Sequence, residues 1–409
     1  MINTKEIKEK YILVGIFDRD EEAAEASLAE LSELTETAGA EAVCFVLQHL
    51  EHPNMSTYVG KGKVDEISIL LRQFEADGII CDDELTPVQI RNLSDILNVK
   101  VIDRTILILD IFAAHASTAE GKLQVETAQL KYRASHLTGL GRALSRLGGG
   151  IGTRGPGETK LEVDRRAIRH RLGVLNGEIK KLAETRKTGR KKRLESSIPV
   201  AAIVGYTNAG KSTLLNRLTK ADILEEDKLF ATLDPTTRKS MLPEGQEILL
   251  TDTVGFINKL PHNLIDAFRS TLEEAKYADF LIHVVDASDP NVDTHMDVVY
   301  DTLRELDITG KPILTVFNKT DLIEGEVILR DKKADMTVRT SLKTGEGAGT
   351  VLEKISELLL RGQRYIETVI PYKDGEMLSK IRKNGRLIRE EYLPEGIRVE
   401  AFISDDMGI

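Results

Sequence analysis

The N-terminal part of the chain alternates short apolar runs with longer amphipathic stretches. Four apolar runs predict β-strands, at residues 11–17, 42–50, 78–81 and 99–102. Four stretches with a helical spacing of apolar residues predict helices, near residues 21–35, 63–75, 86–97 and 105–114. Strands that alternate with helices are typical of an α/β domain, which we place at residues 1–117.

Strand signals disappear between residues 118 and 195. Apolar residues there recur at spacings of three, four and seven, which is typical of the seams between packed helices. The first seam contains Leu123, Leu130, Ala134 and Leu137, and the second contains Leu161, Ile168, Leu172, Leu175, Ile179 and Leu182. Six glycines and a proline at residues 148–158 cannot continue a helix. We therefore expect an antiparallel helical hairpin with a flexible Gly-rich loop.

Strands and helices alternate again from residue 198 to about residue 363. Five runs rich in Val, Ile and Leu predict strands, at residues 200–204, 247–251, 280–285, 313–317 and 337–340. Continuous apolar runs of this kind favour a parallel sheet that is buried on both faces. The remaining residues, 364–409, predict a small α+β domain with strands near 365–371 and 397–403 and a helix from 375 to 392.

Composition narrows the class of protein. The chain has 409 residues, too many for one core, and 41% are hydrophobic and 30% charged, as in an ordinary globular protein. No apolar run approaches the roughly 20 residues of a membrane span, and the first residues lack the apolar core of a signal peptide. Cys44 and Cys81 both fall in strand-like runs and are expected to be reduced. We therefore expect a cytoplasmic protein that does not bind membranes.

A phosphate-binding loop follows the strand at 200–204. It consists of Gly205, Tyr206, Thr207, Asn208, Ala209, Gly210, Lys211 and Ser212. Its glycines let the backbone curl so that N–H groups point toward phosphate oxygens, and the loop opens a helix whose N-terminus favours anions. Lys211 is expected to contact the β- and γ-phosphates, and the Ser212 hydroxyl is expected to bind Mg²⁺.

A base-reading motif ends the strand at 313–317. It consists of Asn318, Lys319, Thr320 and Asp321. The Asp321 carboxylate can accept hydrogen bonds from N1 and the exocyclic amine of guanine, which adenine lacks, so the motif predicts a site for GTP and GDP. Lys319 would lie along the base, and Ser341, Leu342 and Lys343 after the next strand can offer a backbone N–H to the guanine oxygen. A nucleoside or metabolic kinase is disfavoured because such enzymes lack this motif.

Two further segments are expected to contact the γ-phosphate and Mg²⁺. Asp252, Thr253, Val254 and Gly255 follow the strand at 247–251, where Asp252 can hold Mg²⁺ through water and the Gly255 N–H can bind the γ-phosphate. The second segment is a predicted switch loop, with nucleotide contacts expected from Phe230, Ala231, Thr232, Leu233 and Asp234. A switch loop needs a threonine that reaches Mg²⁺. From chemistry alone, Thr232, Thr236 and Thr237 are all candidates.

These motifs place the chain in a Ras-like P-loop class with a mainly parallel sheet, within a multi-domain α/β fold. Together with residues 155–162, 230–238, 58–63 and 82–85, they resemble the HflX family of translation-factor-class GTPases over nearly the whole chain, and that class also includes the Obg-type proteins. The resemblance implies that Thr232 is the Mg²⁺ ligand of the switch loop. It also implies binding to the large (50S) ribosomal subunit in the cytoplasm and a role in separating stalled or idle ribosomes under stress.

Two positions bear on the rate of hydrolysis. Phe256 stands where Ras-type enzymes have a water-orienting glutamine, so we expect slow intrinsic hydrolysis that a partner accelerates; the ring could also simply pack beneath the switch. Asn208 occupies a P-loop position at which potassium-stimulated relatives in this class carry asparagine. It either helps to bind K⁺ beside the β- and γ-phosphates or only shapes the loop.

Residues 151–195 concentrate positive charge in an otherwise acidic chain. They hold 14 Lys and Arg against 6 Asp and Glu, a net charge of +8, whereas the whole chain carries −10. A solvated helix face is one explanation, and phosphate contacts on structured rRNA are the other. The candidate rRNA-binding residues are Arg154, Lys160, Arg165, Arg166 and Arg169.

The sequence therefore predicts a Mg²⁺-dependent GTPase, monomeric when free, that uses GTP as a switch on the large ribosomal subunit to split or recycle ribosomes. One alternative is a GTPase of large-subunit assembly. Another, from a different class, is a signalling switch that docks a protein effector and never contacts RNA.

Overall fold

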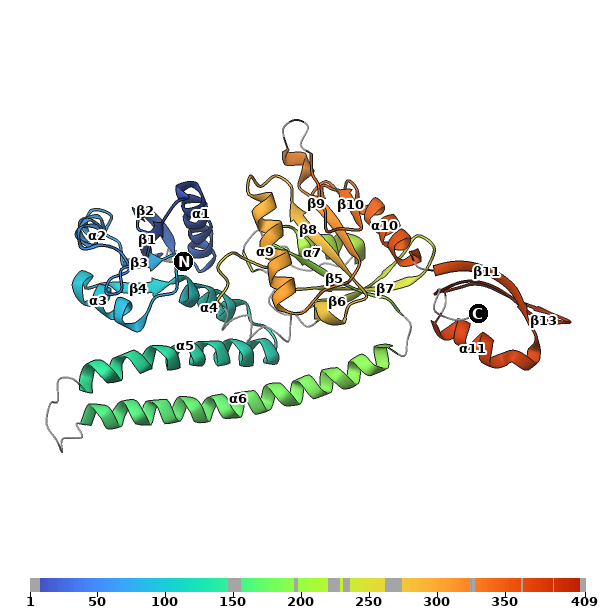
Figure 1. The fold of residues 1–409 in the computed structure, drawn as a ribbon, viewed down its shortest axis with the longest axis horizontal. Helices are drawn as coiled ribbons and strands as arrows, with labels where there is room; N and C mark the ends of the chain where they lie inside the picture. Colours follow the sequence, from blue (N-terminus) through green and yellow to red (C-terminus); the bar gives the residue numbers. More distant parts are fainter. Residues whose placement is uncertain are drawn as a thin grey trace, which may run out of the picture. The chain divides into compact units, whose positions relative to one another are not determined.

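The structure is a computed structural model that describes most of the chain. The described residues are 8–145, 156–194, 198–219, 229–230, 236–261, 274–323, 325, 328–361, 363–384 and 386–404. They form two compact units (Figure 1): one contains residues 1–182 with segments 226–234 and 257–270, and the other contains residues 183–225, 235–256 and 271–409. The four-domain division expected from the sequence stays a prediction.

The N-terminal sheet is parallel throughout. Its strands are β1 (Lys10–Phe17), β2 (Glu41–His49), β3 (Gly78–Cys81) and β4 (Lys100–Asp103), in the order β2-β1-β3-β4. The helices are α1 (Glu21–Thr37), α2 (Lys61–Gln73), α3 (Pro87–Leu97) and α4 (Arg104–His115). Consecutive residues of β1 and β3 are buried, so helices cover both faces of the sheet. All eight predicted elements are confirmed to within a few residues.

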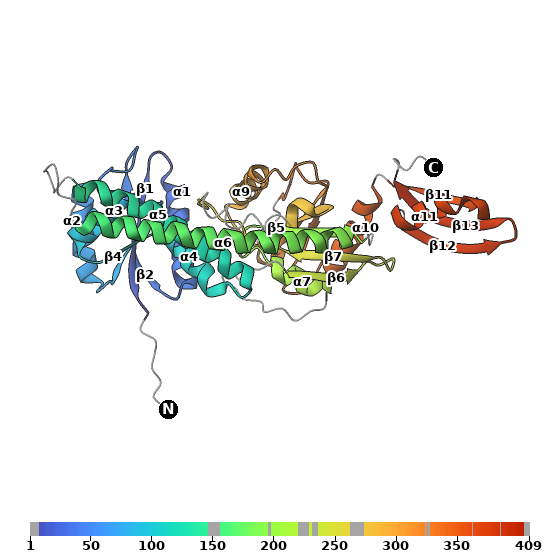
Figure 2. The ribbon, with the colours of Figure 1, turned by 90° about the horizontal axis from the view of Figure 1, so that it is seen from below.

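Two long helices follow, α5 (Ala119–Ser145) and α6 (Pro156–Leu194). Arg165 donates to the Leu137 carbonyl at 3.5 Å, and Arg171 donates to both carboxylate oxygens of Glu126 at 2.7 and 2.8 Å. Because the contacts move backward along α5 as they move forward along α6, the helices are antiparallel, as predicted (Figures 1 and 2). Residues 146–155 lie outside the described residues. Residues 156–158, which the sequence reading placed in the loop, begin α6 instead, because proline is tolerated in the first turn of a helix.

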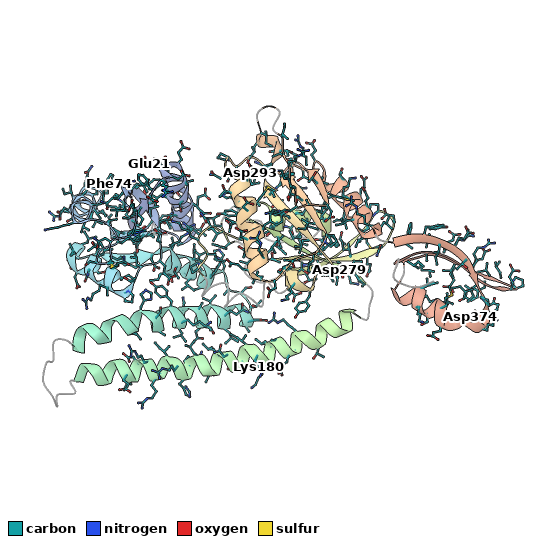
Figure 3. All side chains as sticks on the ribbon, viewed as in Figure 1. Glu21, Phe74, Lys180, Asp279, Asp293 and Asp374 are labelled. Carbon is teal, nitrogen blue, oxygen red and sulfur yellow. The ribbon has the colours of Figure 1, made fainter. Side chains whose placement is uncertain are left out.

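The seam of α6 agrees with the predicted spacing. The less exposed positions of its described middle part include Ile168, Leu172, Leu175, Ile179 and Leu182. Solvent-facing residues such as Lys180 separate them (Figure 3). Helix α5 differs, because its fully buried positions are not those of the predicted seam. Val125, Ala128 and Tyr132 are buried on the side that packs against α3 and α4, so α5 has two covered faces.

The second unit contains a six-stranded sheet in the order β10-β9-β8-β5-β7-β6. Its strands are β5 (Val200–Gly205), β6 (Thr236–Met241), β7 (Glu247–Asp252), β8 (Phe280–Asp286), β9 (Ile313–Asn318) and β10 (Met336–Arg339). Helices α7 (Lys211–Thr219), α9 (Val292–Glu305) and α10 (Ala348–Leu360) accompany it. The five predicted parallel strands are confirmed. The sequence reading missed β6, an antiparallel edge strand, because its residues are mostly polar.

The C-terminal part is a three-stranded antiparallel sheet with one helix. It consists of β11 (Gln363–Ile370), α11 (Gly375–Asn384), β12 (Arg386–Leu393) and β13 (Gly396–Ser404), with sheet order β11-β13-β12. The helix predicted over residues 375–392 is therefore wrong beyond Asn384. Residues 386–393 favour helix by composition, but their backbone pairs with β13, and tertiary pairing overrides local propensity. No helix in the described part of the chain is long and apolar enough to cross a membrane.

Candidate nucleotide-binding site

The phosphate-binding loop connects β5 to α7 at the carboxyl end of the parallel strands. Both of its glycines are needed for close packing. A Cβ on Gly205 would lie 2.2 Å from the Val284 carbonyl oxygen, and a Cβ on Gly210 would lie 2.3 Å from the Asn318 amide nitrogen. Gly210 also has a φ of +97°, which side-chain-bearing residues rarely adopt. The loop is therefore packed tightly between β8 and the base-reading motif.

Lys211 begins α7 and is buried beneath the loop. Its Nζ donates to the Tyr206 carbonyl oxygen at 2.6 Å, so the ammonium lies inside the curl of the loop. Burial lowers the pKa of Lys211 to about 8, although Asp252 partly offsets this. A desolvated cation beside backbone N–H groups suits an anionic ligand, as predicted for the phosphates of GTP.

The residues predicted to hold Mg²⁺ lie together where the structure describes them. The Ser212 hydroxyl donates to Asp252 Oδ2 at 2.8 Å, at the carboxyl ends of the neighbouring strands β5 and β7. A hydroxyl and a carboxylate are the hard oxygen donors that Mg²⁺ prefers, so these two residues fit the ion. The third predicted ligand, Thr232, lies outside the described residues, as do Ala231, Leu233 and Asp234. Thr236 and Thr237 belong to β6.

The Asp252–Gly255 segment lies against the phosphate-binding loop. Its threonine, Thr253, donates from Oγ1 to the Ile203 carbonyl at 2.7 Å. A Cβ on Gly255 would approach both Lys211 Nζ and Thr207 to 2.9 Å, so only glycine fits there. Val254 is buried beside it.

Phe256 continues this contact through its backbone. The Thr207 N–H donates to the Phe256 carbonyl at 2.8 Å, and the Phe256 N–H donates to the Gly205 carbonyl at 3.1 Å. The Phe256 ring is fully buried. This burial agrees with the packing interpretation, and its apolar ring has no group that could orient water.

The two predicted base-reading segments meet at Asn318. Its amide nitrogen donates to the Ala209 carbonyl at 2.9 Å, and its amide oxygen accepts from the Leu342 N–H at 3.0 Å. One side chain thus joins the phosphate-binding loop to the loop that contains Ser341 and Lys343. The phosphate-binding loop, which precedes the other two segments by more than a hundred residues in the sequence, therefore lies beside them.

The remaining base-reading residues form the wall of this site. Thr320 donates from Oγ1 to the Thr340 carbonyl at 2.9 Å, which ties the motif to the end of β10. Lys319 has a left-handed φ of +60° and forms an ion pair with Asp286 at 2.7 Å. Asp321 is exposed on the turn Thr320–Leu322. Its carboxylate is accessible to a base.

Two supporting residues belong to no motif, and the sequence reading missed them. Arg217 on α7 donates to two successive carbonyls, those of Leu342 and Lys343, at 2.9 Å each. His295 on α9 stacks on Tyr206 with ring centroids 3.8 Å apart and planes within 9°. Nothing in the local sequence identifies either residue, because their partners are distant in the chain.

The other predicted site residues lie in three different settings. Asn208 is in the phosphate-binding loop with a left-handed φ of +58°, which asparagine tolerates better than most residues. Phe230 packs edge-on against Phe112, with centroids 4.6 Å apart. On α6, Arg166 and Arg169 are exposed and Arg165 is half-buried. Arg154 and the side chain of Lys160 lie outside the described residues.

A phosphate-binding loop, a Ser212–Asp252 pair and a guanine reader at the carboxyl ends of one parallel sheet define a P-loop GTPase. Three sequence families match in succession: "GTP-binding GTPase N-terminal" at residues 25–113, "GTP-binding GTPase Middle Region" at 115–193 and "50S ribosome-binding GTPase" at 200–319. The chain belongs to the HflX family of GTPases, and it is accordingly a GTP-hydrolysing enzyme.

The relatives match along almost the whole chain. GTPase HflX of Lacrimispora saccharolytica is 56% identical over 407 residues, which cover 100% of this chain and 96% of that protein. GTPase HflX of Escherichia coli is 38% identical over 398 residues, or 97% and 93% of the two chains. A GTP-binding protein of Sulfolobus solfataricus, solved in complex with GDP, is 25% identical, with a TM-score of 0.45 over 86% of this chain and 99% of that one.

Proposed function

We propose that this GTPase binds the large ribosomal subunit through its basic hairpin and uses GTP to separate stalled or idle ribosomes. The observation that carries the proposal is the exposed cationic face of α6. Arg166 and Arg169 project into solvent from a segment of net charge +8, in a chain whose total charge is −10. The match of residues 200–319 to a family described as "50S ribosome-binding GTPase" supports the same partner.

The hairpin suits a structured RNA. Helix α6 has 39 residues and so extends over about 58 Å at 1.5 Å per residue. Its seam residues are covered, and Arg171 is paired with Glu126, whereas the exposed Arg166 and Arg169 can contact phosphates. Phosphate contacts made by arginine are bidentate and depend strongly on salt. On this proposal Arg154, Lys160 and Arg165 are further candidate contacts to rRNA.

In the proposed reaction the nucleotide site works by holding and polarising phosphates. GTP phosphates take the N–H groups of residues 206–211, and Lys211 exchanges its contact with the Tyr206 carbonyl for β- and γ-phosphate oxygens. Mg²⁺, held by Ser212, Thr232 and, through water, Asp252, would neutralise the charge on those oxygens. Asp321 selects guanine, and the Gly255 N–H holds the γ-phosphate.

Slow intrinsic turnover is part of the same proposal. Phe256 has no group that could orient the attacking water, so a ribosomal partner is expected to complete the site. K⁺ beside Asn208 would supply further positive charge near the β- and γ-phosphates. Turnover measured with and without ribosomes, in K⁺ and in Na⁺ at equal ionic strength, tests both expectations. Equal rates with and without ribosomes contradict the first, and equal rates in the two salts contradict the second.

Gradient sedimentation tests the proposed partner and output. The protein is mixed with intact ribosomes and GTP, GDP or a non-hydrolysable GTP analogue. We expect free subunits with GTP and the analogue but not with GDP, and the protein in the large-subunit fraction. Binding only to immature large subunits would instead indicate an assembly factor. If the protein instead captures a protein partner after nuclease treatment and does not bind ribosomes, it is a signalling switch. On our proposal the free protein is monomeric and cytoplasmic.

A matched pair of charge variants tests the hairpin. Arg166→Glu together with Arg169→Glu should weaken ribosome binding and reduce the salt slope of log K by about 2. The control, Lys276→Glu together with Lys332→Glu, makes the same change of charge at exposed sites outside the hairpin and should not alter binding. If both double variants weaken binding equally, the hairpin is not the rRNA-binding face.

A further inference from the structure

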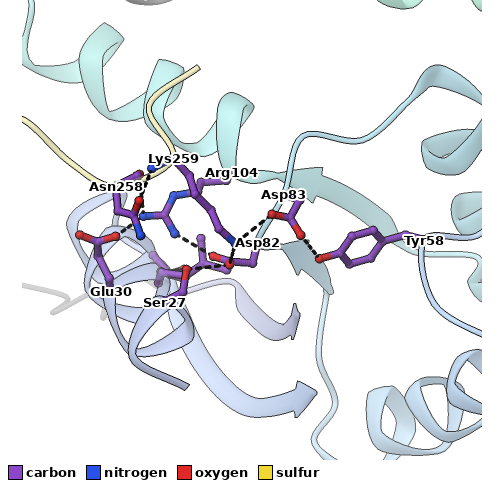
Figure 4. A network of polar contacts seen from close by, with 10 residues as sticks. Ser27, Glu30, Tyr58, Asp82, Asp83, Arg104, Asn258 and Lys259 are labelled. Carbon is purple, nitrogen blue, oxygen red and sulfur yellow. Dashed lines mark hydrogen bonds and ion pairs between the residues drawn. The ribbon is translucent and has the colours of Figure 1, made fainter. Parts of the chain in front are cut away.

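A polar network in the N-terminal unit lies outside the nucleotide site (Figure 4). Its centre is Asp82, directly after β3, which accepts from Ser27 Oγ at 2.7 Å and from Arg104 Nη1 at 2.7 Å. The other guanidinium branch of Arg104 binds Glu30 and the Asn258 carbonyl, the latter at 3.2 Å. Arg104 is almost completely buried, so this network is a built structure and not a surface ion pair.

Lys259 completes the network from a distant part of the sequence. Its ammonium binds Asp82 and also Asp83, the latter at 2.8 Å, while Asp83 accepts from the Tyr58 hydroxyl at 2.6 Å (Figure 4). Burial lowers the pKa of Lys259, but Asp82 and Asp83 outweigh this effect and the pKa is raised. Lys259 also has a left-handed φ of +53°. A non-glycine residue keeps that conformation when its surroundings impose it.

The position of Lys259 in the chain links the network to catalysis. Lys259 follows Phe256 by three residues, and Phe256 closes the segment whose Gly255 lies against Lys211. Asn258 and Lys259 are both bound to residues of the α/β domain. A shift of Gly255 toward or away from the γ-phosphate must therefore be absorbed within two or three residues, or it must move Lys259.

Helix α4 contacts Phe230 in the predicted switch loop and Asn258 after the Asp252–Gly255 segment. Arg104, its first residue, binds the Asn258 carbonyl, and Phe112, two turns later, packs edge-on against Phe230. The helix is firmly held, because Asp103 caps its N-terminus through Ile106 N–H and accepts from Tyr132 on α5 and from the Leu85 N–H. One rigid helix therefore contacts residues that belong to, or closely follow, two segments of the nucleotide site.

We propose that Lys259 is a positioning residue which, with α4, holds the segment after Phe256 and thereby sets the enzyme's preference between GTP and GDP. In the structure, Lys211 is engaged by the Tyr206 carbonyl and Gly255 lies against that lysine. Both nucleotides have a β-phosphate for Lys211, but only GTP has a γ-phosphate that needs the Gly255 N–H. Releasing Lys259 therefore favours GTP over GDP. By linkage, GTP weakens the Lys259 contact to the α/β domain.

Lys259→Met tests the proposal in the full-length protein. Asp82 retains Arg104 and Ser27 as partners and Asp83 retains Tyr58, so the variant leaves no buried carboxylate unpaired. Affinities for fluorescent GDP and for a fluorescent non-hydrolysable GTP analogue are measured by titration. We expect the ratio of GTP-analogue to GDP affinity to rise about fivefold to tenfold, with GDP affinity unchanged.

Two controls separate positioning from a general structural effect. Lys259→Arg retains the cation and should keep the wild-type ratio. Lys100→Met removes another lysine of the same unit, paired with Glu9 at 3.3 Å, and should also keep it. An unchanged or lowered ratio in Lys259→Met overturns the proposal. So does an equal change in both affinities, or an arginine variant that behaves like the methionine variant.

A second variant tests the role of α4 independently of the ion pair. Phe112→Leu removes the ring that packs on Phe230 and should raise the same ratio, by a smaller factor. If this variant remains folded by circular dichroism but leaves the ratio unchanged, α4 does not restrain the predicted switch loop, and that part of the proposal fails. None of these measurements involves ribosomes, so their outcome is independent of the proposed partner.

Discussion

The chain contains two parallel sheets that place polar residues at their carboxyl ends, and the two sheets use them differently. At the six-stranded sheet, Lys211 and Ser212 of the phosphate-binding loop lie near Asp252, and Asp321 is exposed after β9. In the four-stranded sheet, Asp82 follows β3 and Asp103 ends β4, at the equivalent edge. Open α/β sheets generally bind ligands at this edge, where the strand order reverses.

The difference lies in what neutralises the charge. Asp82 is paired with Arg104 and Lys259 of the same chain, and Asp103 accepts from Tyr132 and from two backbone N–H groups. The N-terminal edge is therefore satisfied internally, whereas the edge of the GTPase sheet keeps groups suited to an external anion and cation. Architecture determines where polar groups gather, and the neighbouring side chains determine whether a ligand is needed.

The largest effect is expected on nucleotide affinity, at the carboxyl edge of the GTPase sheet. Asp321→Asn replaces a double acceptor for guanine N1 and the exocyclic amine with a group that can donate. GTP affinity should fall by roughly 1,000- to 10,000-fold, and xanthosine triphosphate, which has a carbonyl in place of that amine, should bind better than GTP. Competition titrations with the two nucleotides measure this. Retention of GTP preference would mean that Asp321 does not read the base.

At the carboxyl edge of the N-terminal sheet, removing a charged side chain should lower the stability of the fold instead of nucleotide affinity. Arg104→Met leaves Asp82 and Glu30 without their shared cation in a buried site. We expect a loss of about 3–5 kcal/mol in the free energy of unfolding of the N-terminal unit, measured by urea denaturation. The discrimination between GTP and ATP should stay as in the wild type. A lost base preference would contradict the separation of the two edges.

A smaller effect is expected for the loop support in the GTPase unit. Arg217→Gln removes two hydrogen bonds to the carbonyls of Leu342 and Lys343. GDP and GTP affinities should fall together by about tenfold, with kcat at saturating GTP unchanged, because the base is gripped less firmly and the phosphates are not. Arg217→Lys can keep only some of these hydrogen bonds, so its nucleotide affinities should lie between those of the wild type and of Arg217→Gln. A fall in kcat alone would assign Arg217 to the phosphate side of the site.

The smallest effect is a pH dependence in the core of the GTPase sheet. Burial lowers the pKa of His283, although Asp331 opposes this. The unfolded chain then binds a proton at a pH where the folded chain does not, so stability is complete above pH ~6.5 and falls as the pH drops below that value. We expect Tm to fall about 2 °C more between pH 7.0 and 5.5 than in His283→Gln. Parallel curves for the two proteins would contradict this.

The sequence predicted the parts whose signals are local. The strands at 200–204 and 313–317, the phosphate-binding loop and the guanine reader each have a short pattern, and the structure brings these segments together at Asn318. The α6 seam was also readable, because a repeat of three and four residues is a property of one helix. The positions that contact GTP and Mg²⁺ remain predictions.

The missed features depend on partners that are distant in the chain. The composition of residues 386–393 favours helix, yet they form β12 because β13 is available for pairing. The polar strand β6 forms because β7 offers an edge. Arg217, His295 and Lys259 act on residues more than 80 positions away, so no local pattern marks them. No local pattern indicated that Lys259 would be the partner of Asp82.

Helix α5 is covered on two faces, and this limits where the chain can be truncated. Cutting after residue 117 would strip α5 from α3 and α4 and expose the surface now covered by Val125, Ala128 and Tyr132, besides leaving Asp103 without the tyrosine hydroxyl. A fragment that ends there should aggregate, whereas one that continues through residue 194 retains its cover. Work on the isolated N-terminal half therefore has to include the hairpin.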